Sequence, residues 1–362
     1  MRVVAIGGGT GLSRLLRGLK RHVIPSAHGP AATADASLPR IEELSAVVTV
    51  TDDGGSSGRL RQALNILPPG DIRNCLVALS EDEALLSRLF RHRFSGGEGL
   101  QGHSFGNLFL AALNEITGDF GEAVKLASAI LATRGRIFPA TTADVRLVAH
   151  MDDGTIVHGE TRITASSRRI VRLELAPKDA KPLAETLEAI ARADLITIGP
   201  GSLFTSLVTN LLVHGLPEAI AGSPALKVFV GNLMSQANES LGFTASDHIR
   251  VLTQHAGWKL FDYALVNNAP LSTSLRAKYA LEAATPIVVD VPAMEEMGVK
   301  VILGDYVEVV ESGGSAVPEK GGHAPSGAAV ARHAADRVAR DLLRIAAQHR
   351  RTPNCDHQAI AH

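Results

Sequence analysis

The sequence is poor in the residues that several classes of protein need. It contains 2 cysteines and 1 tryptophan, and aromatic residues make up 4% of its 362 residues. Cys75 and Cys355 lie far apart and belong to no CxxC or Cys/His spacing, which argues against a disulfide framework and against structural zinc. So few aromatic side chains also argue against an extended stacking platform for single-stranded nucleic acid.

The chain also lacks a large net charge and long apolar runs. The formal net charge is -1, so no long-range attraction draws the chain to nucleic acid or to an anionic membrane. No apolar run reaches the roughly 18 residues of a membrane span, and the N-terminus enters a strand directly, without a leader pattern. We therefore expect a cytoplasmic protein with no membrane span and no nucleic-acid partner. Its 45% hydrophobic content allows a large core.

The stretch VVTVTDDGGSSGRLR, residues 47–61, organises the rest of the chain. Residues 47–51 predict a strand buried on both faces, and Asp52 and Asp53 follow at its carboxyl end, where ligands bind in open α/β sheets. The next residues can present backbone N–H groups and hydroxyls to an anion, namely Gly54, Gly55 and Ser56. Because carboxylates repel a bare phosphate, we expect a cation or a sugar hydroxyl between them. A tight acidic turn is the alternative.

Two further glycine turns each link a buried strand to a helix. The first follows residues 3–6 and contains Gly8, Gly9, Thr10 and Gly11. The second follows residues 195–198 and contains Gly199, Gly201 and Ser202. Helix N-termini favour phosphate groups, although Ser202 can also simply cap its helix. Leu12 occupies the third glycine position of GxGxxG, so the dinucleotide fingerprint is incomplete and argues against ordinary NAD binding.

Polar residues also crowd the starts of two other predicted helices. One group is Asp71, Arg73 and Asn74, and the other is His103, Ser104 and Asn107. The second group lies within about one helical turn, so its side chains can face one point and suit a phosphate or sugar site. In the alternative, Asp71 and Ser104 only cap their helices, Arg73 is solvated and His103 is satisfied locally.

The remaining segments outline one large nucleotide-binding domain over residues 1–310. Within it, residues 25–39 predict a flexible excursion, residues 76–132 a helical cap and residues 144–163 a β-hairpin. Further strands are predicted at residues 228–230, 263–266, 287–290 and 301–310. Residues 311–362 predict a linker, a helix over residues 330–345 and a flexible tail.

Six motifs, in this order, resemble the CofD-like superfamily, and within it the YvcK-type gluconeogenesis factor family. They are GGGTGLS, TVTDDGGSSGRLR, PPGDIRNCLVALS, GHSFGNL, IGPGSLFTSL and NLMSQANES, and the resemblance covers roughly residues 1–310. It implies an α/β fold, a Rossmann-like three-layer α/β/α sandwich, that binds a nucleotide-linked ligand. Members look like binders of UDP-N-acetylglucosamine with a role in growth and cell shape on gluconeogenic carbon sources. The sister branch is 2-phospho-L-lactate transferase, which uses magnesium and a nucleotide-activated phospholactate.

The resemblance also implies roles for individual residues. The two glycine turns would hold the diphosphate, and Asp52 would bind ribose or, in a transferase, Mg²⁺. The group at residues 103–107 would reach the remaining phosphate or sugar oxygens, and Asn232 would close the site. Tyr279 would contact the uracil ring.

Three functions follow as hypotheses. The first is a regulator that senses a nucleotide sugar without turnover, works through a regulatory protein partner and forms a homo-oligomer. The second is a transferase, for which Mg²⁺ is the candidate cofactor. The third, an NAD-dependent oxidoreductase, is opposed by Leu12.

Overall fold

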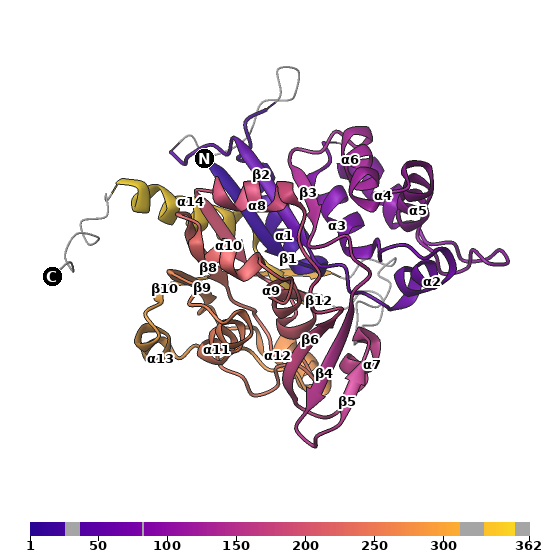
Figure 1. The fold of residues 1–362 in the computed structure, drawn as a ribbon. Helices are drawn as coiled ribbons and strands as arrows, with labels where there is room; N and C mark the ends of the chain where they lie inside the picture. The colour runs from indigo at the N-terminus through magenta and orange to yellow at the C-terminus, as the bar shows by residue number, and fades with distance from the viewer. Residues whose placement is uncertain (26–36, 82, 312–328, 352–362) are drawn as a thin grey trace.

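A seven-stranded parallel sheet forms the centre of the protein (Figure 1). The computed structural model describes residues 1–25, 37–81, 83–311 and 329–351. The strands are ordered β10-β9-β8-β7-β1-β2-β3. Their bounds are β1 Arg2–Gly7, β2 Glu43–Val48, β3 Arg136–Pro139, β7 Leu195–Ile198, β8 Leu226–Val230, β9 Tyr263–Asn267 and β10 Lys300–Gly304. The predicted α/β, Rossmann-like fold is confirmed.

The central strand β1 marks the point where the chain changes direction across the sheet. Ile6 of β1 pairs with Val47 of β2 on one side and with Ile198 of β7 on the other. The chain builds β2 and β3 outward in one direction, then returns to build β7 to β10 in the other. In sheets of this kind the ligand crevice lies at the carboxyl ends of the strands beside such a switch point.

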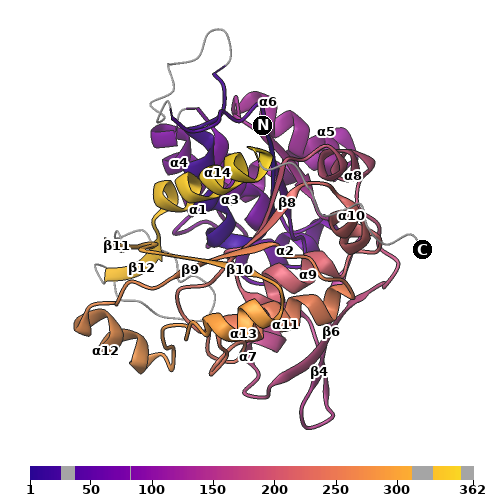
Figure 2. The same ribbon diagram turned by 90° about the vertical axis from the view of Figure 1, so that its left-hand side faces the viewer.

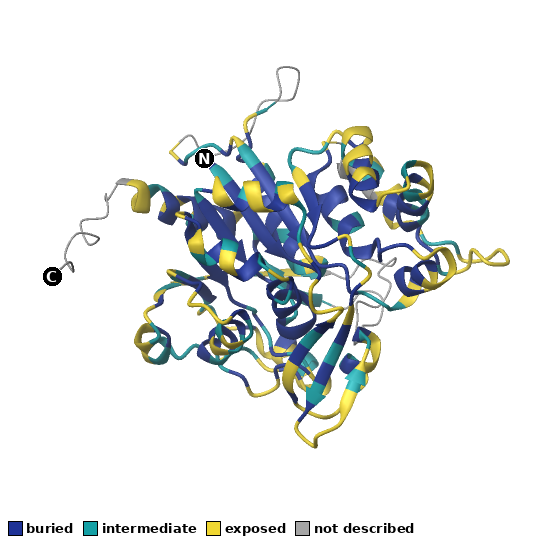
Figure 3. Ribbon diagram, in the orientation of Figure 1, coloured by how far each residue is buried: buried dark blue, intermediate teal, exposed yellow. Residues whose placement is uncertain are grey.

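Helices cover both faces of the sheet, which makes three layers. Alternate residues of β1 face opposite sides: Val3 and Ala5 belong to one apolar core, Val4 and Ile6 to the other. The first face carries α1 (Gly9–Lys20), α3 (Gly70–Leu79), α6 (Phe120–Ile130) and α14 (Ala335–Arg351). The second carries α8 (Ala184–Ala191), the π-helical segment η1 (Leu203–Val208), α9 (Thr209–Leu211), α10 (Leu216–Gly222) and α11 (Ala245–Ala256). Buried residues accordingly fill the middle of the molecule (Figure 3).

A helical cap stands beside β2 and β3, as predicted. It contains α4 (Glu83–Arg91) and α5 (Phe105–Thr117), which pack with α3 and α6, and α2 (Gly55–Leu64) lies against α5. The predicted hairpin is also present, because β4 (Arg146–Met151) and β5 (Ile156–His158) pair antiparallel. A third strand, β6 (Ile170–Ala176), extends it to a small sheet, and α7 (Glu160–Ala165) follows β5.

Three secondary-structure predictions need correction. The strand predicted at residues 47–51 is β2, which begins at Glu43 and ends at Val48, so residues 49–53 form an extended segment beyond the ladder. Residues 287–290 contain one isolated bridge, between Val288 and Thr244, and no strand. Both errors arise because β-branched runs mark extended backbone, whereas a strand also needs a neighbour for its hydrogen bonds.

The third correction concerns the start of the C-terminal helix that was predicted over residues 330–345. Residues 329–333 form a strand, β12, which pairs antiparallel with β11 (Val307–Glu311) apart from the main sheet. The final helix α14 therefore begins at Ala335, and it lies along α1 (Figure 2). The two backbones are close, since a Cβ at Gly18 would stand 2.3 Å from the Ala335 carbonyl oxygen. The predicted linker and tail, and most of the excursion at residues 25–39, lie outside the described residues.

No single helix in the described part of the chain is long and apolar enough to cross a membrane. The segments Leu203–Leu211 and Leu216–Gly222 pass a length and composition test only when they are taken together, and a bend of 76° separates them. Most of their apolar side chains are buried in the second core.

Candidate functional site

The two strand-end glycine turns beside β1 touch each other. A Cβ at Gly11 would stand 2.3 Å from the carbonyl oxygen of Pro200, so only glycine allows α1 to approach the second turn this closely. At Gly8, a Cβ would lie 2.5 Å from Thr49 Cγ2 and 2.9 Å from Asp71 Oδ2. The turn after β1 is therefore packed between the turn after β7, the segment after β2 and the start of α3.

Three helices begin at this place without a side-chain cap. The N-cap residues of α1, α2 and α3 are Gly8, Gly54 and Pro69, and none makes a side-chain cap hydrogen bond. A Cβ at Gly9 or Gly55, both with positive φ, would meet nothing within 4 Å, so the first turns of α1 and α2 face open space. Free N–H groups at three converging helix starts create a positive potential that favours an anion.

Two carboxylates stand among these helix starts. Asp52 Oδ1 accepts a hydrogen bond from Gly54 N at 3.0 Å, and its other oxygen lies 3.3 Å from where a Cβ of Gly70 would be. Asp71, in the first turn of α3, is buried beside Gly8. The described residues contain no group of three or more His, Cys, Asp or Glu side chains placed to hold a metal ion. A Mg²⁺ bound at Asp52 would thus need ligand oxygens to complete its coordination.

Asp53 is engaged elsewhere. Its Oδ1 accepts hydrogen bonds from Thr161 N at 2.8 Å and from Thr161 Oγ1 at 2.6 Å, in the first turn of α7. A Cβ at Gly159 would stand 2.5 Å from its other oxygen. Asp53 thus joins the glycine segment to the small β-sheet, and its predicted role as a ligand residue stays a prediction.

The predicted polar groups of α2, α3 and α5 meet in one network. His103 Nδ1 and Ser56 Oγ are 3.0 Å apart, and Asn107 Nδ2 donates to Ser56 Oγ at 3.1 Å. Arg73 donates to Ser104 Oγ at 2.7 Å and to Asn107 Oδ1 at 3.0 Å. Ser104 also accepts from Asn107 N, so it caps α5 while it takes part in the network. The side chains converge as expected, and the capping alternative holds only for Ser104: the N-cap of α3 is Pro69, not Asp71, and Arg73 is hydrogen-bonded, not solvated.

Arginine is concentrated around this network. Arg73 also donates to Asn74 Oδ1 at 2.9 Å, so its side-chain partners are neutral oxygens. Arg93 donates to Gly102 O at 2.9 Å, and Arg59 Nη2 would lie 3.1 Å from a Cβ at Gly102. Within the described residues, none of these three guanidinium groups has a carboxylate at ion-pair distance.

Burial and neighbouring positive charges lower the pKa values of Arg73 and His103 in this region. Burial and the charge of Arg93 lower the pKa of Arg73 to about 10. Burial, together with Arg59 and Arg93, lowers the pKa of His103, which keeps its imidazole neutral near pH 7. Arg93 was missed by the sequence reasoning, and the basic run Arg91–His92–Arg93 was the available signal.

At the second glycine turn, the helix start is capped by the chain itself. The buried Glu239 accepts from Phe204 N at 3.3 Å and from Thr205 Oγ1 at 2.9 Å, at the beginning of η1. Ser202 Oγ accepts from Gln236 Nε2 at 2.9 Å. A phosphate at this turn would therefore find fewer free donors than at α1. Glu239 and Gln236 were not predicted, although both lie in the polar motif NLMSQANES.

Asn232 joins this turn to a cavity at the ends of β8 and β9. Gly201 N donates to Asn232 Oδ1 at 3.2 Å, and Asn232 Nδ2 donates to Gly201 O at 2.8 Å. The cavity, of about 300 Å³, is lined by residues that include Asn232, Asn267, Asn268, Leu271, Arg276 and Ile287. Its mixture of apolar walls and a few polar groups is typical of small-molecule sites.

Tyr279 lies on the same helix as Arg276, α12 (Thr273–Leu281), but does not line this cavity. Its hydroxyl accepts a hydrogen bond from Ala331 N of β12 at 2.9 Å. The predicted contact of Tyr279 with a uracil ring stays a prediction, and Arg276 is a further candidate for base recognition.

The chain matches the model of a known protein family. The model of the family described as 2-phospho-L-lactate transferase CofD matches residues 3–307. The chain belongs to the CofD family. The match runs from β1 into β11, so it includes every strand of the central sheet and every residue of the candidate site.

Relatives in this family carry the name gluconeogenesis factor. One from Halalkalibacterium halodurans is 50% identical over 304 residues, 84% of this chain and 88% of that protein. Another from Bacillus subtilis is 47% identical over 306 residues, 84% of this chain and 91% of that protein. A crystal structure of a Bacillus halodurans protein superposes with a TM-score of 0.82 at 46% identity, covering 94% of this chain and 99% of that one. A second crystal structure, described as a UPF0052 family member from the same organism, gives 0.81.

Proposed function

We propose that this CofD family member is a cytoplasmic regulator that binds UDP-N-acetylglucosamine, without turning it over, and adjusts cell-wall synthesis and cell shape on gluconeogenic carbon sources. The observation that carries the proposal is the continuity of the site. Asn232 links the cavity at β8 and β9 to the second glycine turn, and Gly8 of the first turn lies beside Asp71, two residues before Arg73 of the polar network.

The order of these parts matches the order of groups in a nucleotide sugar. Along the sheet come the cavity at β9 and β8, the glycine turns at β7 and β1, and the Asp52 segment after β2. Four strand spacings of about 4.8 Å make about 19 Å, enough for a base, a diphosphate and a sugar in line. The base would occupy the cavity, and the sugar would lie near Asp52 and the network.

Charge supports a phosphate-containing ligand. Three uncapped helix starts and the guanidinium groups of Arg59, Arg73 and Arg93 surround the region, and the charges of Asp52 and Asp71 offset only part of this positive charge. Asp52 and Asp71 are suited to accept hydrogen bonds from hydroxyls of ribose or sugar. Burial, together with the charge of a neighbouring arginine, lowers the pKa values of Arg73 and Arg93, so a bound anion would stabilise their charged forms.

A magnesium-dependent transferase of the CofD type is the second candidate. Asp52 and Asp71 lie beside helix N-termini that favour phosphate groups. A divalent cation there would neutralise the negative charges of the carboxylates and of the phosphate. In that case Asp52 would hold the cation and stabilise charge on the phosphoryl group during transfer to a hydroxyl acceptor.

Calorimetric titration with UDP-N-acetylglucosamine, UDP, GDP and NAD, each with and without Mg²⁺, tests the proposal. Sugar-dependent binding of the UDP ligand, with the ligand recovered intact, is the expected result. A preference for GDP, or strict Mg²⁺ dependence, would instead favour the transferase. If none of the four compounds binds, both candidate functions are contradicted.

Asp52→Asn separates the two candidates further. In a regulator it weakens binding by the loss of one charged hydrogen bond, about 1.5–3 kcal/mol. In a transferase it lowers turnover far more than affinity. If neither affinity nor turnover changes, the assignment of Asp52 to the site is wrong.

A further inference from the structure

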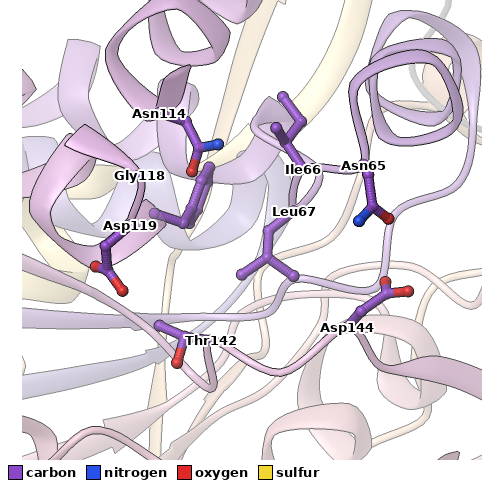
Figure 4. A pocket seen from close by; sticks show the side chains of 9 residues that line it. Asn65, Ile66, Leu67, Asn114, Gly118, Asp119, Thr142 and Asp144 are labelled. Carbon is purple, nitrogen blue, oxygen red and sulfur yellow. The ribbon is translucent and has the colours of Figure 1, made fainter. Parts of the chain in front are cut away.

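A second cavity, of about 250 Å³, lies apart from the site described above (Figure 4). It is bounded by the C-terminal end of α2, the turn between α5 and α6, and the loop after β3. Helix α2 has 10 residues, so at 1.5 Å per residue its two ends are about 15 Å apart. Its first turn carries Ser56 of the polar network, whereas Asn65, just beyond its last turn, lines the cavity.

Uncommitted polar side chains surround this cavity. Asn65, Asn114 and Thr142 line it, and none of their side chains has a hydrogen-bond partner among the residues the structure describes. Two amides and a hydroxyl together offer both donors and acceptors. Beneath this rim lie the apolar side chains of Ile66, Leu67 and Phe120, each no more than 7% exposed.

The two carboxylates of the lining are already compensated. Asp144 forms an ion pair with Arg61 of α2. Asp119 is the N-cap of α6, where its Oδ1 accepts from Glu122 N at 2.8 Å and its charge is favoured by the helix dipole. The cavity therefore has no uncompensated charge that would select an ion.

We propose that this cavity is a second binding site, for a small neutral polyhydroxylated molecule such as a monosaccharide or a linear polyol. Hydroxyl groups both donate and accept, which matches the amides of Asn65 and Asn114, and the C–H surface of the same molecule packs on the apolar floor. The volume lies below the roughly 300–1,000 Å³ of drug-sized pockets, which limits the occupant to about one ring.

Saturation-transfer NMR on the full chain, kept saturated with UDP-N-acetylglucosamine so that the sugar region near Asp52 is also filled, tests this site with glucose, mannitol and the diamine putrescine as probes. Glucose or mannitol should bind with a Kd on the order of 1 mM, a weak affinity that suits a ligand of this size. Binding should persist at saturating UDP-N-acetylglucosamine. No transfer to either polyol, displacement of the polyol by UDP-N-acetylglucosamine, or a response to putrescine alone would each overturn the proposal.

Variants locate the binding. Asn114→Leu preserves side-chain size and removes two hydrogen-bonding atoms, and it should weaken polyol binding about tenfold. Thr142→Val, in a loop, should act in the same direction without depending on α5. Gln62→Leu is the matched control, because Gln62 is exposed on α2 and does not line the cavity. Unchanged affinity in both Asn114→Leu and Thr142→Val, with a folded protein by circular dichroism, would overturn the proposal.

Discussion

Asp53 and Thr161 form a link between two parts of the protein that are 108 residues apart in sequence. The carboxylate of Asp53 accepts from both the backbone N–H and the hydroxyl of Thr161. Asp53 is the immediate neighbour of Asp52, and Thr161 belongs to α7, which connects β5 and β6 of the small β-sheet. The position of the Asp52 segment is therefore coupled to the placement of that sheet.

Removing this link should destabilise the protein moderately. Asp53→Ala removes the side chain that acts as a cap for α7, so we expect a loss of about 0.5–2 kcal/mol in the free energy of unfolding. Urea unfolding measures it, with Asp152→Ala, at an exposed hairpin turn, as control. Thr161→Ser, which keeps the hydroxyl, should lose less than Thr161→Val. Equal losses in these two Thr161 variants would contradict a role for the hydroxyl.

Arg73 should contribute to ligand affinity through its charge and its forked geometry. Arg73→Met removes a charged donor close to the expected phosphate or sugar oxygens, and we expect at least about tenfold weaker binding of UDP-N-acetylglucosamine. Arg73→Lys should restore only part of it, because a single ammonium nitrogen cannot occupy the positions of the two guanidinium nitrogens that donate to Ser104, Asn107 and Asn74.

Calorimetry at two salt concentrations checks this prediction. The affinity of Arg73→Met should depend less on salt than that of the wild type, since one cationic contact is lost. Arg88→Met, on the exposed side of α4, is the matched control and should bind like the wild type. Wild-type affinity in Arg73→Met would remove Arg73 from the site.

The contact between the two glycine turns should tolerate no side chain. In Gly11→Ala the new Cβ would stand 2.3 Å from Pro200 O, so backbone has to move, and we expect a loss of about 1–3 kcal/mol in unfolding free energy together with weaker nucleotide binding. Gly222→Ala in α10 meets nothing within 4 Å and should be neutral or slightly stabilising. Thermal unfolding and calorimetry compare the two variants. If both behave alike, close packing of the turns is not important.

Acidic pH should destabilise the protein through His333. Burial lowers the pKa of His333 to about 4, and its Nε2 lies 3.0 Å from Gly231 O at the end of β8. The unfolded chain then binds more protons than the folded one between about pH 6.5 and pH 4, so stability is lost as pH falls through that window. The total loss from this group is at most about 3 kcal/mol.

Urea unfolding at pH 7 and pH 5 measures this loss. His333→Gln should show a smaller difference between the two pH values than the wild type. The remaining dependence is expected from His103, His248 and His255, whose pKa values burial also lowers. An unchanged difference in His333→Gln would mean that another group causes the pH dependence.

The architecture and the cluster of polar groups at the strand ends could both be predicted from local sequence. Apolar strands followed by glycine turns and amphipathic helices predict parallel units, and parallel strands bring their carboxyl ends to one edge. At that edge the structure brings Gly8, Asp71 and Gly201 together, although they lie far apart in the chain. The convergence of His103, Ser104 and Asn107 could also be predicted from local sequence. These residues lie within one turn, so helical geometry alone brings their side chains to one face.

Tertiary structure decided which of these groups the chain uses for itself. Asp52 and Asp53 look equivalent in sequence, but only Asp53 has Thr161 as its partner. Glu239 caps η1, and Ala331 donates to the Tyr279 hydroxyl. Each of these contacts joins segments separated by at least 34 residues, and no local propensity specifies such a pairing. The sequence by itself therefore determined that polar groups gather at the strand ends, while only long-range packing decided which of them hydrogen-bond to distant parts of the chain.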